Sequence, residues 1–292
     1  MINREHSSPH GVIRQGVVLG NGIVSGEASG ATIELNSGTI PARNNPPAHR
    51  YDARIPKSDW RPPTPAEMQI LCATPRKLDA PCVEVVSADP EVLRLSAKAF
   101  ANVTWPNSAT DLAAAIDSSA YRELIAAMLE CGGRLGKVLK DPLVRISAPG
   151  LSTVTIDKDL FIGLHVDEWF LDPQTSRRQR PNRMVFNLGP QPRYFLFLNI
   201  PVEEMTDLIP VDSQRPSSSE GTAIGLRFMQ SYPDYPVCRV RVHPGEAYIA
   251  PTENLVHDAS SAGVTRVDIA GHVLGYFGLA RTSQTLSEPE ER

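Results

Sequence analysis

The sequence predicts an α+β fold in which helices come first and an antiparallel β-sandwich or barrel follows. Two long helical patterns lie within residues 89–140, and after about residue 142 the chain changes to short β-rich runs. Pro, Gly, Asn and Asp bound these runs, as turns do between closely spaced strands. With 292 residues, 41% of them hydrophobic, the chain is long enough to bury a sizeable core.

The N-terminal part is unlike the rest. From Met1 to about Asn45 it is rich in Gly, Ser and Thr, and only residues 16–35 have the pattern of short strands. The following segment, PARNNPPAHRYDARIPKSDWRPPTPAEM, is dense in proline and poor in core residues, which favours an extended arm. We therefore predict an arm over residues 1–80 and a domain of helices and β-rich segments over residues 81–292.

Two helical segments open the second region. Residues 89–100 begin with Asp-Pro, a helix-start signal, and residues 108–140 carry Leu and Met at helical spacings. Gly132 and Gly133 predict a break or an end in the second segment. The strands are expected in residues 143–148, 152–157, 161–167, 183–189, 193–200, 237–245, 246–251 and 267–277.

Charge and cysteine usage exclude several classes of function. A net charge of -4 gives no electrostatic reason to expect a nucleic-acid partner. No apolar run reaches the length of about 18 residues that a membrane span needs, and the N-terminus lacks the apolar core of a secretory signal. The four cysteines, Cys72, Cys82, Cys131 and Cys238, have no paired metal spacing. Reduced thiols in a cytoplasmic protein are the expectation.

The stretch GLHVDEWF, residues 163–170, places His165 and Asp167 two residues apart. On a strand, such residues point to the same face, so their side chains converge on one point. That point is either a metal ion or a hydrogen-bonded pair at the end of a strand. The pair alone does not decide between these readings.

A second histidine lies some ninety residues downstream. His257 follows the predicted strand EAYIAP, and a turn of small residues leads from it to Arg266, at the start of the last strand. Two histidines and a carboxylate on a β-scaffold match the facial triad of non-haem Fe(II), which leaves three positions for other ligands. The second histidine therefore favours the metal reading for His165 and Asp167.

His165-x-Asp167, then His257, then Arg266 nine residues later resembles the iron(II)- and 2-oxoglutarate-dependent dioxygenases. The resemblance covers roughly residues 142–280 and implies a double-stranded β-helix, also called a jelly roll or cupin-like core, backed by the helices. It also implies that the triad holds Fe(II) and that Arg266 pairs with the distal carboxylate of 2-oxoglutarate, the co-substrate used with O2. For the other carboxylate of 2-oxoglutarate, the candidates are Asn187 and Asn199.

Strand alternation offers a check on Arg266. Period-two alternation places Arg266, Asp268, Ala270 and His272 on one face of the last strand. If this row faces the barrel interior, Arg266 lines the site, and if it faces water, Arg266 makes a surface salt bridge. His272 is expected beside the metal site without binding the ion, and His243, before a Pro-Gly turn, is expected at the surface.

Residues after the metal pair are candidates for substrate contact. Glu168 and Trp169 follow Asp167 directly, with a rim residue and a packing aromatic as the alternative reading. The loop DPQTSRRQRPNR then carries four arginines, at positions 177, 178, 180 and 183. Such a loop is either a solvated surface or a cationic lid, in which Arg183 and its neighbours would hold an acidic substrate or an acidic carrier protein.

The resemblance implies an oxygenase that hydroxylates an unactivated C–H bond of a small molecule, such as an amino acid or a specialised metabolite. Family members that halogenate have a small residue in place of the triad carboxylate, so Asp167 favours hydroxylation. Two other readings stay open. One is a cupin-like metal isomerase or dioxygenase that does not use 2-oxoglutarate, and the other is a non-enzymatic β-sandwich binding module. No oligomeric state follows from the sequence.

Overall fold

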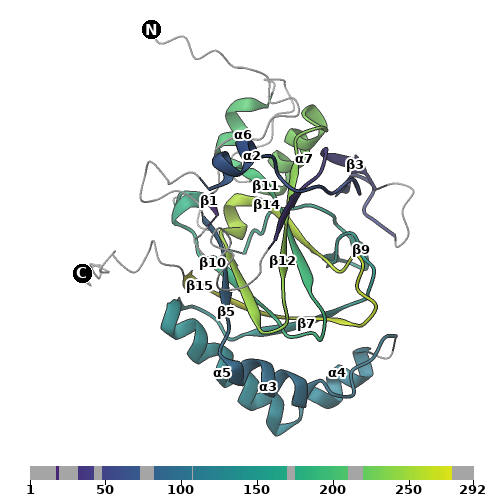
Figure 1. The fold of residues 1–292 in the computed structure, drawn as a ribbon, viewed down its shortest axis with the longest axis vertical. Coiled ribbons are helices and arrows are strands. Elements are labelled where there is room, and N and C mark those ends of the chain that lie inside the picture. Colours follow the sequence, from purple (N-terminus) through teal and green to yellow (C-terminus); the bar gives the residue numbers. More distant parts are fainter. Residues whose placement is uncertain are drawn as a thin grey trace, which may run out of the picture.

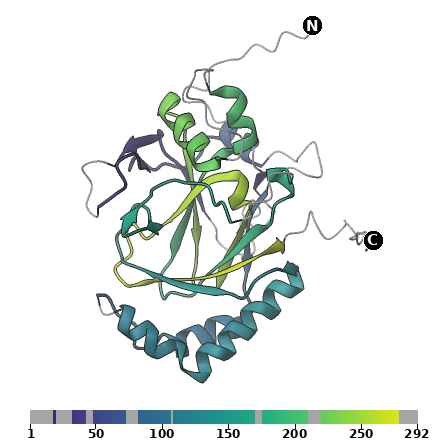
Figure 2. The same cartoon turned by 180° about the vertical axis from the view of Figure 1, so that it is seen from behind.

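The structure is a computed structural model that describes residues 18–19, 32–42, 48–72, 82–106, 108–169, 175–209 and 220–277. Helices and strands form one α+β assembly in which two sheets face each other and helices lie outside them (Figures 1 and 2). The α+β prediction is confirmed at this level. No helix within the described ranges has the length and apolar character to cross a membrane.

The larger sheet has the strand order β1-β5-β13-β10-β15-β6, and β7 also pairs with β15. All of its pairings are antiparallel except that of β1 with β5. Its strands are β1 (Val18–Leu19), β5 (Cys82–Ser87), β6 (Gly136–Val138), β7 (Leu143–Ser147), β10 (Asn182–Asn187), β13 (Glu246–Ala250) and β15 (Asp268–Phe277).

The smaller sheet is antiparallel, with the order β14-β11-β12-β2. Its strands are β2 (Ile33–Leu35), β11 (Arg193–Pro201), β12 (Val237–Val242) and β14 (Leu255–Ser260). Short hairpins flank it, formed by β3 (Thr39–Pro41) with β4 (Arg54–Pro56) and by β8 (Ile156–Asp157) with β9 (Leu160–Phe161). Part of the proline-rich region thus contributes strands, while the division of the chain at residue 80 stays a prediction.

The inner faces of the two sheets pack on each other. Phe195 of β11 and Tyr248 of β13 stack with ring centroids 4.1 Å apart, although they belong to different sheets. Val185 and Ala270 of the larger sheet share a buried cluster with Phe197 of the smaller one. Inward-facing side chains of both sheets therefore meet in the space between them, where a site can be formed.

The predicted helices pack on the outer face of the larger sheet. α3 (Pro90–Ala99), α4 (Ser108–Ile116) and α5 (Ser119–Leu135) lie along one side of the molecule, below β7 in Figure 1. α2 (Pro65–Leu71), α6 (Val202–Leu208) and α7 (Gly221–Ser231) lie toward the opposite end. Met128 of α5 contacts outward-facing residues of β10 and β15, so these helices close a second core behind the sheet.

The start of α3 is as predicted. Asp89 caps it, because its carboxylate accepts a hydrogen bond from the backbone N–H of Glu91 at 2.9 Å, and Pro90 occupies the first turn. The second helical segment differs from the prediction. It breaks before Ser118, which caps α5, and not at the two glycines, which lie inside α5. A Cβ at Gly132 would lie 3.1 Å from a methyl group of Val138, so this glycine allows α5 to approach the sheet closely.

Two strand predictions near the site were wrong in their extent. Of residues 152–157, only Ile156–Asp157 form a strand. Residues 161–167 are not a continuous strand, because β9 ends at Phe161 and, of residues 162–167, only His165 forms a bridge, to His257. The predicted strands within 183–200 and 237–250 are confirmed. The four cysteines are free thiols, two of them buried.

Candidate metal centre and active site

His165 lies opposite His257 of β14, through an isolated bridge at the edge of the smaller sheet. The backbone N–H of His165 donates to the carbonyl of His257 at 2.9 Å, and the N–H of His257 donates to the carbonyl of His165 at 2.7 Å. Residues that exchange both hydrogen bonds are directly opposed, so their side chains leave the sheet on the same side. The two imidazole centroids are 4.8 Å apart as a result.

Local backbone contacts fix how each imidazole is turned. Nδ1 of His165 lies 2.9 Å from the carbonyl oxygen of Gly163, and Nδ1 of His257 lies 2.9 Å from that of Leu255. A carbonyl oxygen can only accept, so each Nδ1 carries the proton. Each Nε2 is left with a free lone pair, which is the tautomer that a metal-binding histidine needs.

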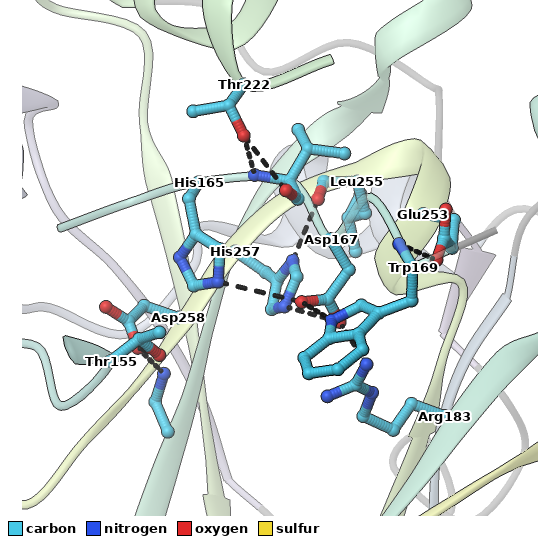
Figure 3. Close-up of polar contacts among 12 residues, drawn as sticks. Thr155, His165, Asp167, Trp169, Arg183, Thr222, Glu253, Leu255, His257 and Asp258 are labelled. Atoms are coloured by element: carbon cyan, nitrogen blue, oxygen red, sulfur yellow. Dashed lines mark hydrogen bonds and ion pairs between the residues drawn. The ribbon is translucent and has the colours of Figure 1, made fainter. Parts of the chain in front are cut away.

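Asp167 completes the group. One carboxylate oxygen lies 3.8 Å from Nε2 of His165 and the other lies 3.7 Å from Nε2 of His257. The three donor atoms lie within 4.8 Å of one another, and all three residues are buried. Figure 3 shows the three side chains pointing toward one another. Within the described ranges, no other group of three His, Cys, Asp or Glu residues meets this standard.

Electrostatics keep the donors in the forms that bind a metal. Burial lowers the pKa of both His165 and His257, so both imidazoles are neutral at pH 7. Burial alone would raise the pKa of Asp167, but Arg183 and the two histidines outweigh it and hold that pKa well below its usual range. The site thus presents two neutral imidazoles and one carboxylate.

Two side chains orient the carboxylate of Asp167. Nη2 of Arg183 lies 2.9 Å from one carboxylate oxygen, and the indole N–H of Trp169 donates to the other at 3.2 Å. The Arg183 guanidinium also lies 5.5 Å from the centre of the Trp169 ring (Figure 3). These contacts hold the carboxylate where it faces the imidazoles.

The triad opens into a cavity of about 70 Å³ between the two sheets. Trp169 stands at its edge with 52% of its surface exposed. Besides the triad, its charged and titratable lining residues are Arg145, Arg183, Arg193, Asp258, His272 and Tyr248. The cavity is therefore rich in cationic side chains, which suits anionic ligands.

Arg266, the residue that the sequence pattern assigned to 2-oxoglutarate, lies elsewhere. β15 begins at Asp268, so Arg266 belongs to the preceding turn, where its backbone N–H donates to the side chain of Gln191 at 2.8 Å. Its side chain is exposed and borders a different, mostly apolar groove beside α3. The prediction that Arg266 faces the interior was wrong, because the alternation of the strand does not extend back to it.

Asn187 and Asn199 do not line the cavity either. The side chain of Asn187 closes the turn after β10, where it donates to the carbonyls of Gln191 and Val242 at 2.9 Å. Asn199 is completely buried in β11, among core residues of the smaller sheet. The structure therefore does not support their predicted contact with 2-oxoglutarate.

Of the residues predicted to contact substrate, Trp169 and Arg183 line the cavity, and Glu168 does not. The carboxylate of Glu168 accepts from the backbone N–H of Gly221 and pairs with Arg177 at 3.5 Å. Glu168 thus joins two chain segments rather than facing a ligand.

The arginine-rich loop is neither a solvated surface nor a free cationic lid. Arg177 donates to the carbonyl of Glu253 at 2.7 Å and is buried. Arg178 pairs with Glu203 at 2.7 Å, and Arg180 pairs with Glu253 at 3.5 Å. These arginines hold the loop to the protein, and of the four only Arg183 reaches the cavity.

Sequence reasoning missed Arg145 and Arg193. Arg193 begins β11, and alternation with the inward-facing Phe195 and Phe197 could have placed it in the interior. Arg145 lies on β7 opposite Ala270, which alternation does place toward the cavity. Nothing in the sequence indicated that β7 pairs with the last strand.

His272, which is half-buried on β15, predicts a pH dependence of stability. Burial first, and then Arg183, Arg193 and Arg145, lower its pKa well below the ordinary value, so the unfolded chain binds a proton that the folded protein does not. This contribution to stability is complete above about pH 6.5 and is lost as the pH falls below it. Thermal unfolding of His272→Asn at pH 5 to 8 should show a smaller loss of stability on acidification than the unmodified protein. An equal loss of stability in both proteins would contradict the role of His272. Buried carboxyl groups with raised pKa, such as Asp268, have the opposite pH dependence, and comparing the two proteins cancels it because both contain these groups.

Comparisons with known proteins add little to this geometry. No protein-family model and no curated protein sequence matches the chain. Among solved structures, it is similar to the Kdo hydroxylase KdoO, a non-heme Fe(II) alphaketoglutarate dependent dioxygenase, in complex with succinate and Fe(III) (TM-score 0.38, 14% identity, covering 68% of this chain and 80% of that one). The apo structure of the same hydroxylase gives a TM-score of 0.36 at 14% identity and covers 68% and 81%. A likeness this low carries no argument about the function of this chain.

Proposed function

We propose that the protein is an Fe(II)- and 2-oxoglutarate-dependent oxygenase. The observation that carries the proposal is the buried cluster of His165, Asp167 and His257, with both Nε2 lone pairs and an ionised carboxylate directed at one point. Two imidazoles and one carboxylate are the protein ligands of the facial triad of non-haem iron. A binding module whose histidines were incidental would have no reason to orient all three donors.

The donor set fits Fe(II) on chemical grounds. The Asp167 oxygen that lies 3.7 Å from Nε2 of His257 is buried and pairs with the Arg183 guanidinium at 2.9 Å, but it has no aligned hydrogen-bond donor among the described residues, so a second lone pair there can face a cation. Three protein donors leave further positions for 2-oxoglutarate and O2. When bound, iron and these co-substrates supply the oxidation of a C–H bond, coupled to conversion of 2-oxoglutarate to succinate and CO2.

The course of the strands supports a double-stranded β-helix. Along the chain, β10 lies in the larger sheet, β11 and β12 in the smaller, β13 in the larger, β14 in the smaller and β15 in the larger. A chain that passes back and forth between two facing sheets builds a jelly roll. His257 lies on β14 of this core. His165 pairs with it from the segment between β9 and β10.

Arg193 is our candidate for the residue that holds the distal carboxylate of 2-oxoglutarate, in place of Arg266. It lines the cavity and only 2% of it is exposed; its Nε faces Asp268 without hydrogen-bond alignment, and its Nη1 has no hydrogen-bond acceptor among the described residues. Asp268 lies 3.3 Å from its guanidinium and holds it in place. Buried donors of this kind suit a carboxylate ligand, which the guanidinium fork can bind in a bidentate manner.

The separation of Arg193 from the triad also suits 2-oxoglutarate. His257 pairs with Phe197 in the strand register, and Arg193 is four residues before Phe197. That offset is about 13 Å along the strand, a span that a five-carbon dicarboxylate and an arginine side chain can bridge together. Tyr248 lines the same cavity and is our candidate to offer a hydroxyl to the same carboxylate.

The chain's own residues prepare the site for this reaction. Arg183 and Trp169 orient the Asp167 carboxylate, and the carbonyls of Gly163 and Leu255 orient the two imidazoles. Burial of the triad keeps bulk water away from it, and Trp169 stands where a substrate would enter. We propose hydroxylation of a small molecule, such as an amino acid or a specialised metabolite, as the reaction.

Anaerobic addition of Fe(II) and 2-oxoglutarate to the purified protein tests the proposal. We expect the weak visible charge-transfer band of an iron-bound 2-oxoacid, and release of succinate when O2 is admitted. Iron binding without the band would favour a cupin-like enzyme that does not use 2-oxoglutarate. A protein that binds no iron would contradict both enzyme readings and leave the binding module.

A further inference from the structure

The cavity contains one arginine more than the triad and 2-oxoglutarate account for. We infer that Arg145 binds the carboxylate of the substrate, and that the substrate is a small carboxylic acid. This inference rests on the proposed function, because it concerns the same cavity. It places acid recognition inside the cavity and not on the arginine-rich loop.

The position of Arg145 follows from strand pairing. β7 is antiparallel to β15, with Arg145 opposite Ala270 and Leu143 opposite His272. Opposed residues share a face of the sheet, and both Ala270 and His272 line the cavity, so Arg145 points into it as well. The small side chain of Ala270 leaves space beside the guanidinium.

Of the three arginines that line the cavity, Arg183 and Arg193 form ion pairs with described residues and Arg145 does not. Arg183 pairs with Asp167 at 2.9 Å, and Arg193 pairs with Asp268 at 3.3 Å. Arg145 has neither an ion pair nor a side-chain hydrogen bond with any described residue, although it is half-buried. A cation held in a cavity without an acidic partner is a receptor for an anion that the ligand brings.

Arg145 suits the substrate better than the co-substrate. Arg193 is almost completely buried and held by Asp268, as a residue needs to be to hold a co-substrate in every turnover. Arg145 comes from β7, which pairs only with β15 among the described strands, and it is more accessible than Arg193. A ligand that enters after 2-oxoglutarate can therefore still reach Arg145.

Asp258 extends the recognition to a second group of the substrate. It lines the same cavity from β14, and its Oδ1 accepts a hydrogen bond from the Thr155 hydroxyl at 2.7 Å. Its Oδ2 is buried and has no aligned hydrogen-bond donor among the described residues, although the backbone N–H of Val154 lies beside the carboxylate. A hydroxyl or ammonium group of the substrate would supply that donor, which makes a hydroxy acid or an amino acid the expected class.

The test uses the full chain loaded anaerobically with Fe(II) and 2-oxoglutarate. The probes are the standard amino acids, short 2-hydroxy acids and sugar acids, each compared with its own methyl ester. Binding is followed by the shift of the visible band, and turnover by succinate release after O2 is admitted. We expect at least one acid to shift the band and stimulate succinate release, and its ester to need a concentration about tenfold higher or more.

Variants of Arg145 show whether this residue binds the carboxylate of the substrate. Arg145→Ala should raise the half-saturating concentration of that acid at least about tenfold and leave the affinity for 2-oxoglutarate nearly unchanged, while Arg145→Lys should restore part of the loss. The inference is overturned if no acid in the panel acts, if esters act as well as acids, or if Arg145→Ala weakens 2-oxoglutarate binding instead. An unmodified protein that shows no visible band would instead contradict the proposed function.

Discussion

Replacing His257 with alanine should abolish the iron-dependent activity. The substitution removes one of three protein donors and leaves the carboxylate of Asp167 facing only His165, so iron affinity should fall by more than about 100-fold. The visible band with 2-oxoglutarate should disappear, and succinate release should fall to background. Equilibrium dialysis of Fe(II) and the anaerobic spectrum measure the two effects separately.

His243→Ala is the matched control for this experiment. His243 is also partly buried and close to a β-strand, but it lies in the turn before Glu246 and takes no part in the cluster. It should retain the band and the turnover. If His257→Ala kept iron and activity, or if both variants lost them equally, the triad would not be the metal site.

Removing the guanidinium of Arg193 should weaken the binding of 2-oxoglutarate more than any other change outside the triad. Loss of one partner from a buried, hydrogen-bonded charge pair costs about 2 kcal/mol or more, which corresponds to a factor of about 30 in affinity. Titration of 2-oxoglutarate into the iron-loaded protein, followed by the visible band, gives the dissociation constant directly. Iron binding itself should change little, because Arg193 does not contact the triad.

Two further variants make this prediction decisive. Arg193→Met leaves Asp268 buried without its cation, so the double variant Arg193→Met/Asp268→Asn removes both charges and separates ligand binding from stability. Arg266→Ala changes the exposed arginine that the sequence pattern favoured and should bind 2-oxoglutarate normally. If Arg266→Ala, and not Arg193→Met, weakened binding, the original assignment from the sequence would be restored.

The sequence by itself determined the composition of the metal cluster. His165 and Asp167 were identifiable because residues two apart share a face, and this convergence survives although residues 161–167 form no continuous strand. His257 was identifiable because a histidine that follows a β-rich run completes a known donor set. The helix start at Asp89 was predictable for a similar reason, since capping and first-turn proline act within a few residues.

Only the tertiary structure decided which cations serve the cavity. Arg266 was selected by counting along the chain, but the first residue of β15 sets the alternation, and that boundary depends on pairing with β7 and β10. Arg145 and Arg193 reach the cavity because their strands pair with partners far away in the sequence. From the sequence alone, an arginine on a short strand is expected at the surface. Its place in the interior becomes evident only when the structure shows which face of the strand the opposite sheet covers.

Gly132 and the arginine-rich loop also show the difference between what the sequence determines and what the tertiary structure decides. Gly132 resembled a helix break, yet it lies inside α5 and allows this helix to pack closely on Val138 of β6 and on Val273 and Phe277 of β15. The arginines of residues 177–180 resembled a lid, yet acids from Glu168, Glu203 and Glu253 pair with them. Local periodicity and helix capping depend on neighbouring residues, so they can be predicted from the sequence. The partners of charged groups depend on long-range packing, which only the folded structure shows.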